Sequence, residues 1–558
     1  MKVKRIFLLL AVICLLAGLA GCNLDEMLPN ETNTANGESK TAEDAVMQAK
    51  KLSAADVAAD PVSVILGRPT DSEVTASVLT NTAAEVYVEW GANSGAYTRK
   101  SETLTCDGTT PAVFVLNELA DDARSYYRVS WKAKGEDAFT PLDEASVQTA
   151  RVSGETFRFT IQSDSHLKNK ANEDLYAQSM ANMAALQPDF LFDLGDAFIN
   201  DLNAKGKAAN KAMIQQNYRA QLPYFSVVAK SAPLFLTIGN HEGEYGNILN
   251  GSADNLARSS SLARTTYYPN PVPNDFYSGN TDTEPGLGSP QNYYAFTWGD
   301  ALFVSIDPYR YSTIHPYGKG DGWDWTLGKT QYDWFRTTLE NSTAKYKFVF
   351  SHHEIGNIRG GAEAAKLYEW GGYGKNGAYL FDQKRPGWGK PIQQVMADTN
   401  VTVFFQGHDH VFAREVVDGV VYQTLPKPAE TEPDAQNNFR FYSNADLLLN
   451  SGFLSVTVSP EKVSIGYYRS YFVSTEAQTG NTGLVYSYDI DASGNVSVTK
   501  GQADDVSTYP AASKAGKASK TEKNGKTDNP AVTPVLPETT PSGASAAQPL
   551  ESPTVVAD

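Results

Sequence analysis

Cysteine and histidine are both scarce in this chain, which has three cysteines and seven histidines among 558 residues. Cys14 and Cys22 lie close to the N-terminus, so Cys106 is alone in the body of the sequence. Three cysteines are too few for a Cys-rich zinc site, and a single cysteine in the body forms no disulfide within the mature chain. Any bound metal ion must therefore be held by His, Asp, Glu or Asn side chains.

Long basic stretches are also absent from the body of the chain, whose formal net charge is −17 at pH 7. Nucleic-acid phosphates are bound mostly through Lys and Arg, so the charge argues against nucleic acid as the main partner. An apolar content of 41% and an aromatic content of 11% are ample for a folded core. The length suggests more than one domain.

The N-terminus has the pattern of an export signal. Residues 2–5 carry three basic side chains and precede the apolar run IFLLLAVICLLAGLA, which is too short and wrongly flanked for a comfortable membrane span. The residues LAGC at 19–22 resemble a bacterial lipobox, and this resemblance implies a lipid on Cys22. We therefore expect residues 1–22 to be a lipoprotein signal peptide, with an ordinary signal peptide as the alternative. The protein would then be exported and lipid-anchored to the cell membrane or an outer membrane.

Two polar segments flank the part of the chain that is expected to fold. Residues 23–55 are small and polar without clear periodicity, which predicts a flexible tether. Residues 508–558 are rich in Ala, Ser, Thr, Pro and Lys, which predicts a disordered tail. The tail is lysine-rich between residues 514 and 526, so binding to a wall or surface is an alternative to a solvated tail.

The expected folded part divides into two regions with different patterns. Residues 56–150 contain short alternating strands separated by turn residues, which predicts a small β-sandwich. The pieces ILGRPT, VYVEWG and YYRVSW in this region resemble the fibronectin-like domain that precedes the catalytic domain of purple acid phosphatases. From residue 155 strands alternate with helical stretches, which predicts a layered α/β domain over residues 155–500. Strands dominate again after residue 411 and are expected to complete a second sheet.

Five apolar strands of the second region each end in residues that commonly bind metals. The clusters are Asp164-Ser165-His166, Gly195-Asp196, Gly239-Asn240-His241-Glu242, His352-His353 and Gly407-His408-Asp409-His410. In open α/β sheets ligands bind beyond the carboxyl ends of the strands, so all five clusters can converge on one crevice. Six of the seven histidines lie in these clusters, with His315 as the exception. One such cluster is more often a surface turn, but five in this order are not.

The order D-x-H, GD, GNHE, H and GHxH closely resembles the calcineurin-like metallophosphoesterases. The resemblance implies an α/β (α+β-type) four-layer sandwich with two mixed β-sheets flanked by helices, preceded by the β-sandwich. It also implies hydrolysis of small phosphate esters, with two metal ions that ionise a bridging water and clamp the phosphate oxygens. Two carboxylate ligands leave such a site with net positive charge for an anionic substrate. Mixed nitrogen and oxygen ligands suit Mn, Fe, Zn or Co.

Carried over by position, the resemblance assigns a role to each cluster. The implied ligands of the first ion are Asp164, His166 and His410. Asp196 would bridge both ions, and the other ligands of the second ion would be Asn240, His352 and His408. His241 would donate a proton to the leaving group or steady the transition-state charge. His352 is chosen over His353 because it enters from the strand; the two could be exchanged, and the other would lie behind the ligands or face the substrate.

Other residues are weaker candidates for substrate contacts. The region 306–325 is rich in Tyr and Trp, and its Arg310 or Lys319 could touch phosphate. The alternative is a long loop that packs its aromatic side chains onto the domain. Arg359 could assist phosphate binding as well, although an arginine held in a salt bridge is the commoner outcome.

One departure separates the chain from purple acid phosphatases. Their tyrosine three residues after the bridging Asp ligates ferric iron, whereas this position is Ile199 here. Their first motif also lacks the histidine present here as His166. We therefore predict no purple tyrosinate colour. A phosphomonoesterase is favoured because the N-terminal region resembles that branch. A phosphodiesterase or nucleotidase of the same fold is one alternative, and a non-catalytic surface binding lipoprotein is another.

Overall fold

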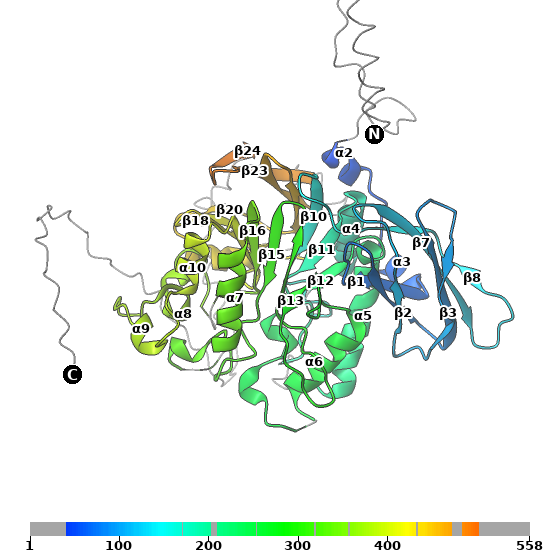
Figure 1. Ribbon diagram of the computed structural model, residues 1–558, viewed down its shortest axis with the longest axis horizontal. Coiled ribbons are helices and arrows are strands. Elements are labelled where there is room, and N and C mark those ends of the chain that lie inside the picture. Colours follow the sequence, from blue (N-terminus) through cyan, green and yellow to red (C-terminus); the bar gives the residue numbers. More distant parts are fainter. Residues whose placement is uncertain are drawn as a thin grey trace, which may run out of the picture. The chain divides into compact units, whose positions relative to one another are not determined.

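The computed structural model describes residues 41–501, apart from 170, 202–208, 253, 317, 319, 355–357, 431–433 and 471–482. The expected signal peptide with Cys22, most of the expected tether, Lys319 and the expected tail 508–558 lie outside the described residues. From Ala42 onward the described residues belong to one compact unit (Figure 1). Within these ranges, every helix is too short or too polar to cross a bilayer.

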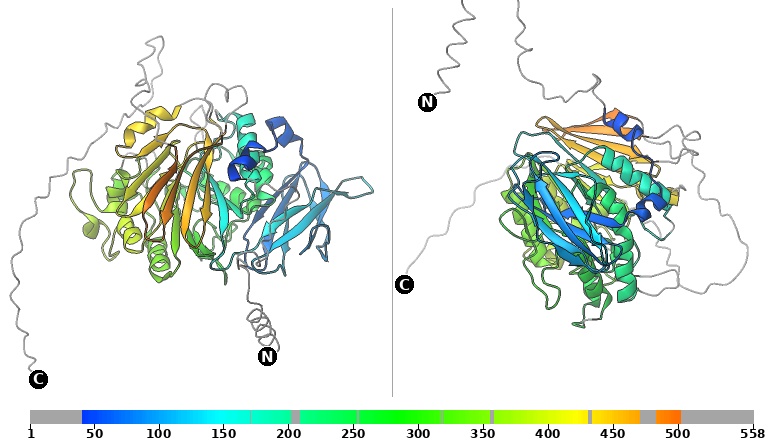
Figure 2. Two further views of the ribbon diagram at one scale, coloured as in Figure 1. Left: turned by 90° about the horizontal axis from the view of Figure 1, so that it is seen from above. Right: turned by 90° about the vertical axis from the view of Figure 1, so that its right-hand side faces the viewer.

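Two short helices, α2 (Ala42–Met47) and α3 (Ala54–Ala59), precede the first sheet. Both lie beside helix α4 (Glu173–Ala185) in the two views of Figure 2, where they are dark blue. Each buries one valine, Val46 and Val57, in the cluster that includes α4. The predicted tether 23–55 therefore ends earlier than expected. Its helices are stabilised by these tertiary contacts, which a small and polar sequence does not reveal.

A β-sandwich follows, and the predicted N-terminal sandwich is confirmed. One sheet has the order β1-β2-β6, and the other has β4-β3-β7-β8, with β5 and β9 pairing β3 and β7. The strands are β1 Val62–Gly67, β2 Val74–Thr80, β3 Ala84–Gly91, β4 Arg99–Lys100, β5 Leu104–Cys106, β6 Ala112–Leu116, β7 Arg124–Ala133, β8 Thr140–Pro141 and β9 Ala145–Gln148. Buried and exposed residues alternate along β6, as the pleat of a strand with one solvated face requires.

The sandwich packs on helix α5 (Lys211–Ala229) of the next domain through buried polar and apolar contacts. Val64 N donates a hydrogen bond of 2.9 Å to Ser226 Oγ, and the Tyr127 hydroxyl donates one of 2.5 Å to Lys230 O. Ile65 of β1 belongs to the same buried cluster as the apolar side chains of α5. The sandwich is thus continuous with the core behind the first large sheet.

Two large mixed sheets form the second domain. The seven-stranded sheet has the order β12-β11-β10-β21-β22-β23-β24, and the eight-stranded sheet has β13-β14-β15-β16-β17-β19-β18-β20. Strands β10, β11 and β12 are parallel, as are β15, β16, β17 and β19. The strands are β10 Phe157–Gln162, β11 Phe190–Asp193, β12 Leu234–Leu236, β13 Ser278–Gly279, β14 Tyr294–Trp298, β15 Ala301–Ser305, β16 Tyr346–Phe350, β17 Val403–Gln406, β18 Phe412–Val417, β19 Val420–Thr424, β20 Asp446–Leu448, β21 Gly452–Val458, β22 Lys462–Arg469, β23 Gly483–Asp491 and β24 Val496–Lys500.

The core of this domain lies between the two sheets and is rich in phenylalanine. Alternate residues of each strand face it: Phe190 and Phe192 of β11 point inward, whereas Leu191 points to the helices outside. Phe192 stacks on Phe350 of the opposite sheet, with ring centroids 4.0 Å apart. The sheets are therefore packed face to face.

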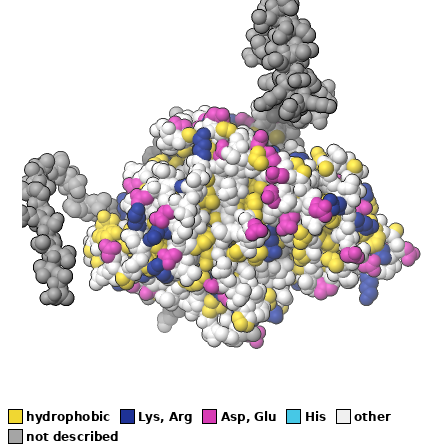
Figure 3. Space-filling view, in the orientation of Figure 1, with side chains coloured by type: hydrophobic (Ala, Val, Ile, Leu, Met, Phe, Trp, Pro, Cys, Tyr) yellow, Lys and Arg dark blue, Asp and Glu magenta, His cyan; other side chains and the backbone are white. Residues whose placement is uncertain are grey.

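Helices cover the outer faces of both sheets. The helices of the domain are α4, α5, α6 Leu256–Tyr267, α7 Lys329–Asn341, α8 Tyr368–Gly371, α9 Phe381–Lys384 and α10 Ile392–Asp398, with short 3₁₀ turns at η2 Asn240–Glu242, η3 Gly246–Ile248, η4 Gly322–Asp324, η5 Ala364–Lys366 and η6 Asp434–Phe441. Apolar side chains of α4 and α5 join a cluster with Leu191, and those of α7 and α10 join one with Val349. The predicted four-layer fold is confirmed. On the face drawn in Figure 3, basic side chains are scattered among acidic ones.

Candidate metal centre

The five clusters follow the carboxyl ends of β10, β11, β12, β16 and β17. Two glycines let the loops touch. A Cβ on Gly407 would lie 1.9 Å from Ser163 Oγ, and one on Gly239 would lie 2.2 Å from Asp196 N. Real Cβ atoms do not approach other atoms so closely, so any larger residue would push the loops apart. The fold therefore brings the five clusters to one place.

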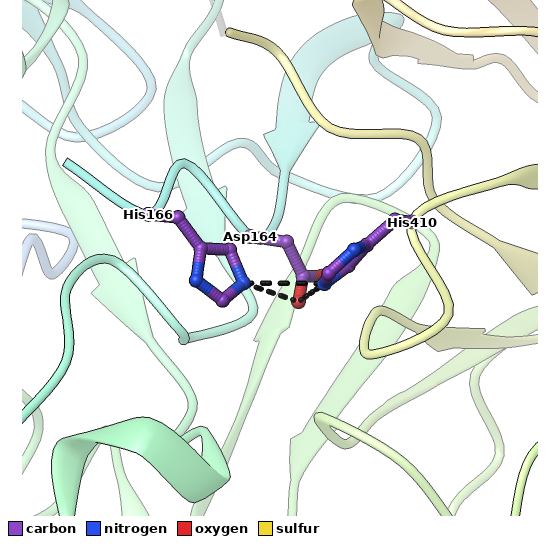
Figure 4. Close-up of side chains that lie close together, drawn as sticks. All are labelled: Asp164, His166 and His410. Atoms are coloured by element: carbon purple, nitrogen blue, oxygen red, sulfur yellow. Dashed lines mark hydrogen bonds and ion pairs between the residues drawn. The ribbon is translucent and has the colours of Figure 1, made fainter. Parts of the chain in front are cut away.

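The first group comprises Asp164 and His166, from the loop after β10, and His410, from the loop after β17, and their side chains point toward one another (Figure 4). Asp164 Oδ1 lies 3.2 Å from His410 Nε2 and 3.5 Å from His166 Nε2. The two Nε2 atoms are 3.2 Å apart. A carboxylate oxygen and two imidazole nitrogens at these separations can all reach one ion with only small movements.

The second group comprises Asp196, His352 and His408 and is buried throughout. Asp196 Oδ2 is 3.1 Å from His352 Nε2 and 3.9 Å from His166 Nε2, so this carboxylate reaches both groups. Its Oδ1 accepts a 2.6 Å hydrogen bond from His241 N at the start of η2, which keeps Oδ2 turned to the imidazoles. Asn240, in the same turn, is fully buried. Asp196 therefore lies between the two groups.

Three buried atoms of these groups make no hydrogen bond: Asp164 Oδ1, His352 Nε2 and His408 Nε2. The first two have only another candidate ligand nearby, at 3.2 Å and 3.1 Å, and His408 Nε2 has no polar partner among the described residues. A buried polar atom without a partner is destabilising, so such atoms call for a ligand. His352 Nδ1 lies 2.8 Å from Leu194 O and donates to it, which leaves Nε2 as the nitrogen that can bind a metal. The residues present thus fit two metal ions.

The backbone of the candidate ligands is strained. Asp164, His166, Asp196, His408 and His410 have φ values of 60°, 46°, 55°, 66° and 60°. This left-handed region costs a residue with a Cβ about 1–2 kcal/mol, and such residues concentrate at functional sites. The left-handed conformation therefore destabilises the turns but points the side chains toward one another.

Residues 157–412 match the calcineurin-like phosphoesterase family. This part of the chain, which carries all five clusters, is therefore similar to calcineurin-like phosphoesterases. Among solved structures, PhoD is 16% identical with a TM-score of 0.57, covering 79% of this chain and 92% of PhoD. PhoD therefore shares the fold.

More distant structures resemble the chain less. GAP50, the anchor in the inner membrane complex of Plasmodium, is 13% identical with a TM-score of 0.34, covering 62% of this chain and 90% of its own. A putative 5′-nucleotidase from Staphylococcus aureus is 13% identical with a TM-score of 0.28, and the match covers 62% of this chain and 53% of the nucleotidase chain. The chain matches no curated protein.

Of the histidine pair after β16, the structure brings His352 and not His353 to Asp196. The buried His353 ring packs edge-to-face on His408, with centroids 4.4 Å apart, and lies 5.4 Å from Tyr309. Burial lowers the pKa of His353 to about 3. His353 thus supports a candidate ligand and is too buried to face a substrate, which was one of the two roles considered for it.

His241 lies at the open side of the site, with 22% of its side chain exposed. Its Nδ1 is 2.8 Å from Asp201 Oδ1, and Asp201 Oδ2 accepts a 3.0 Å hydrogen bond from the Tyr245 hydroxyl. Burial disfavours the charged ring, but Asp196 and Asp201 outweigh it and raise the pKa of His241 to about 9. Its Nε2 is 3.9 Å from Asp196 Oδ2. The ring can therefore hold a proton beside the metal positions.

Two acids that support the candidate site received no role from the sequence. Asp201 orients His241, and the only signal was an acid five residues after Asp196. Glu242 is the last residue of GNHE. Its Oε2 accepts hydrogen bonds from Gly239 N at 2.7 Å and Asp196 N at 3.0 Å. Glu242 thus clamps the loop of Asp196 to that of Asn240.

The two arginines considered for phosphate binding are held by other partners. Arg310 is buried and forms an ion pair with Glu284. Arg359 Nη1 donates hydrogen bonds to His408 O at 2.8 Å and to Asp409 Oδ1 at 2.9 Å. Arg359 therefore fits the salt-bridged alternative and anchors the loop that carries His408.

Proposed function

We propose that this protein is an exported, lipid-anchored phosphatase that hydrolyses small phosphomonoesters at a centre of two transition-metal ions. The observation that carries the proposal is the pair of adjacent His/Asp groups, which contain buried atoms without a hydrogen bond and which Asp196 Oδ2 approaches at 3.9 Å from His166 and 3.1 Å from His352. The loss of any ligand by decay would favour the alternative of a non-catalytic binding lipoprotein. All seven ligand-type residues are present instead, together with His241.

Each residue has a distinct task in this proposal. When bound, the two ions would supply a nucleophile at neutral pH by ionising water and would neutralise the phosphate oxygens. Asp196 would contact both ions. The first ion would also be held by Asp164, His166 and His410, and the second by Asn240, His352 and His408. The metals proposed are Mn, Fe, Zn or Co, as the mixed donor set suggests.

His241 would act on the leaving group. Asp201 accepts from Nδ1, so a proton on Nε2 is directed toward the metal positions, where a departing alkoxide needs it. The hydrogen bond from Tyr245 holds Asp201 in turn. Asp201 is therefore a positioning residue that fixes the ring and tautomer of His241.

Two chromogenic substrates test the proposed activity. The purified protein, stripped of metal and then reloaded with Mn, Fe, Zn or Co, would be assayed with p-nitrophenyl phosphate and bis-p-nitrophenyl phosphate. We expect metal-dependent hydrolysis with a higher kcat/KM on the monoester, since the N-terminal sandwich resembles that of phosphatases. Preference for the diester would replace the proposal by a phosphodiesterase. Activity on neither substrate, with any of the four metals, would favour the binding lipoprotein.

The proposed export and anchoring are tested separately through Cys22. In cells fed a palmitate analogue, the wild-type chain would carry the label and sediment with membranes, whereas Cys22→Ser would do neither. An unlabelled wild-type chain in the soluble exported fraction would instead support an ordinary signal peptide.

A further inference from the structure

A small cavity of about 10 Å³ lies beside the turn that carries His352. The polar side chains of its walls come from three separate segments, and Ile392 of α10 adds an apolar wall. Glu354 belongs to the loop after β16, Trp325 to the connection between β15 and α7, and Glu369 to helix α8. None of the candidate metal ligands lines the cavity, so it lies outside the site described above.

Unsatisfied polar atoms line this cavity. Glu354 is 3% exposed, and both of its carboxylate oxygens are buried without a hydrogen-bond partner. The same is true of the indole nitrogen Nε1 of Trp325. Glu369 differs, since its Oε1 accepts from Leu327 N at 2.8 Å and its Oε2 from Arg385 Nε at 2.5 Å. Glu354 and Trp325 thus offer an acceptor and a donor that nothing else in the described part of the chain uses.

We propose that the cavity binds one water molecule, which accepts a hydrogen bond from Trp325 Nε1 and donates one to Glu354. Its volume matches the roughly 10–15 Å³ that a single buried water requires, and such waters need two to four polar partners. A carboxylate oxygen of Glu369 has a further lone pair for the second proton of the water. A metal ion fits less well because Trp325 presents an N–H donor, which repels a cation.

The bound water makes Glu354 a positioning residue. It joins the turn of His352 to the aromatic connection and to α8 through hydrogen bonds that the side chains do not make directly. Outer partners of this kind commonly change metal affinity by 10–100-fold when they are lost. The water site needs no catalytic activity, whereas its effect on metal binding rests on the proposed metal centre.

Crystallography of the full chain tests the water site without reference to activity. At high resolution we expect one peak within hydrogen-bond distance of both Trp325 Nε1 and Glu354. A direct Glu354–Trp325 hydrogen bond with no peak in the cavity would overturn the site. So would an anomalous peak there after soaking with rubidium, which would identify a cation.

Zinc titration of the metal-free protein tests the positioning role. We expect Glu354→Leu to weaken zinc binding about tenfold, and Trp325→Phe to weaken it about threefold. The double variant should be no worse than Glu354→Leu, because both changes act through one water. Additive effects, or wild-type affinity in Glu354→Leu, would refute the role even if the water is seen.

Two further variants keep the titration interpretable. Glu354→Gln retains an acceptor of nearly the same size and should restore most of the affinity lost in Glu354→Leu. Trp334→Phe is the matched control, since Trp334 Nε1 bonds the exposed Ser278 Oγ at 3.3 Å, away from the cavity. If Glu354→Leu does not fold, Glu354→Gln and Trp325→Phe still decide the question. Equal losses in Trp334→Phe and Trp325→Phe would mean that the effect is not specific to the cavity.

Discussion

The two candidate metal positions differ in how far they are closed off. In the first group His410 keeps 25% of its side chain exposed, whereas Asp196, His352 and His408 of the second group are all buried. The second group also contains two of the three buried atoms without a hydrogen bond. The open position is suited to exchange and to contact with a substrate, and the closed one to permanent occupancy.

The largest effect is expected from a substitution that impairs both candidate metal positions at once. Asp196→Asn removes the carboxylate charge that lies between the two groups. Stabilisation of the transition state by bound metal ions is worth several kcal/mol, so we expect turnover to fall about a thousandfold or more. Steady-state hydrolysis of p-nitrophenyl phosphate measures the loss. Asp333→Asn, on the exposed face of α7, is the control. Near-wild-type turnover in a folded Asp196→Asn protein would refute the mechanism.

His241 tests the open side of the site. A general acid typically contributes 10²–10⁴-fold, so His241→Gln should lower kcat on an alkyl phosphate by roughly a hundredfold or more. The loss on p-nitrophenyl phosphate should be much smaller, because nitrophenolate departs without a proton. Asp201→Asn should show the same dependence on leaving group to a lesser degree. Equal losses on both substrates would show that His241 stabilises charge rather than donating a proton.

Chelation compares the two candidate metal positions directly. We expect EDTA to remove metal in two phases, because His410 of the first group reaches solvent, whereas all three residues of the second group are buried. Metal content measured over time would show a fast and a slow loss of similar size. His410→Ala should remove the fast phase, and His352→Ala the slow one. A single phase in the wild-type protein would contradict the difference in closure.

The smallest effect is expected at Arg359, which braces the loop of His408 from outside. Arg359→Gln should lower zinc affinity by at most about tenfold, at the low end for outer partners of a metal site. KM for p-nitrophenyl phosphate should hardly change, because the guanidinium is held by Asp409. A large rise in KM with unchanged metal affinity would restore the idea that Arg359 binds phosphate.

Much of the fold and of the candidate metal centre could be predicted because it depends on patterns among residues close together in the sequence. Phe190 and Phe192 alternate with Leu191 in β11, and the ligand-type residues follow the strands directly. Contacts between distant segments could not be predicted in this way. The pairing of Arg310 with Glu284, and the packing of Val46 and Val57 on α4, depend on which surfaces meet in space.

Asp201 illustrates the intermediate case. It lies five residues after Asp196, close enough to be noticed, but only the turn between them shows that its carboxylate reaches His241. The same holds for His353, whose neighbour in the sequence is a candidate ligand. Burial of its own ring against His408 could not be deduced from the motif.

The left-handed backbone of five candidate ligands has a consequence for how this protein can change. A glycine at Asp164, for example, would relax the turn and at the same time remove a ligand. Selection for a more stable chain and selection for a metal centre therefore favour different residues at the same positions. A descendant that lost its metals would be expected to gain glycines first at these turns, while the phenylalanine core stayed as it is.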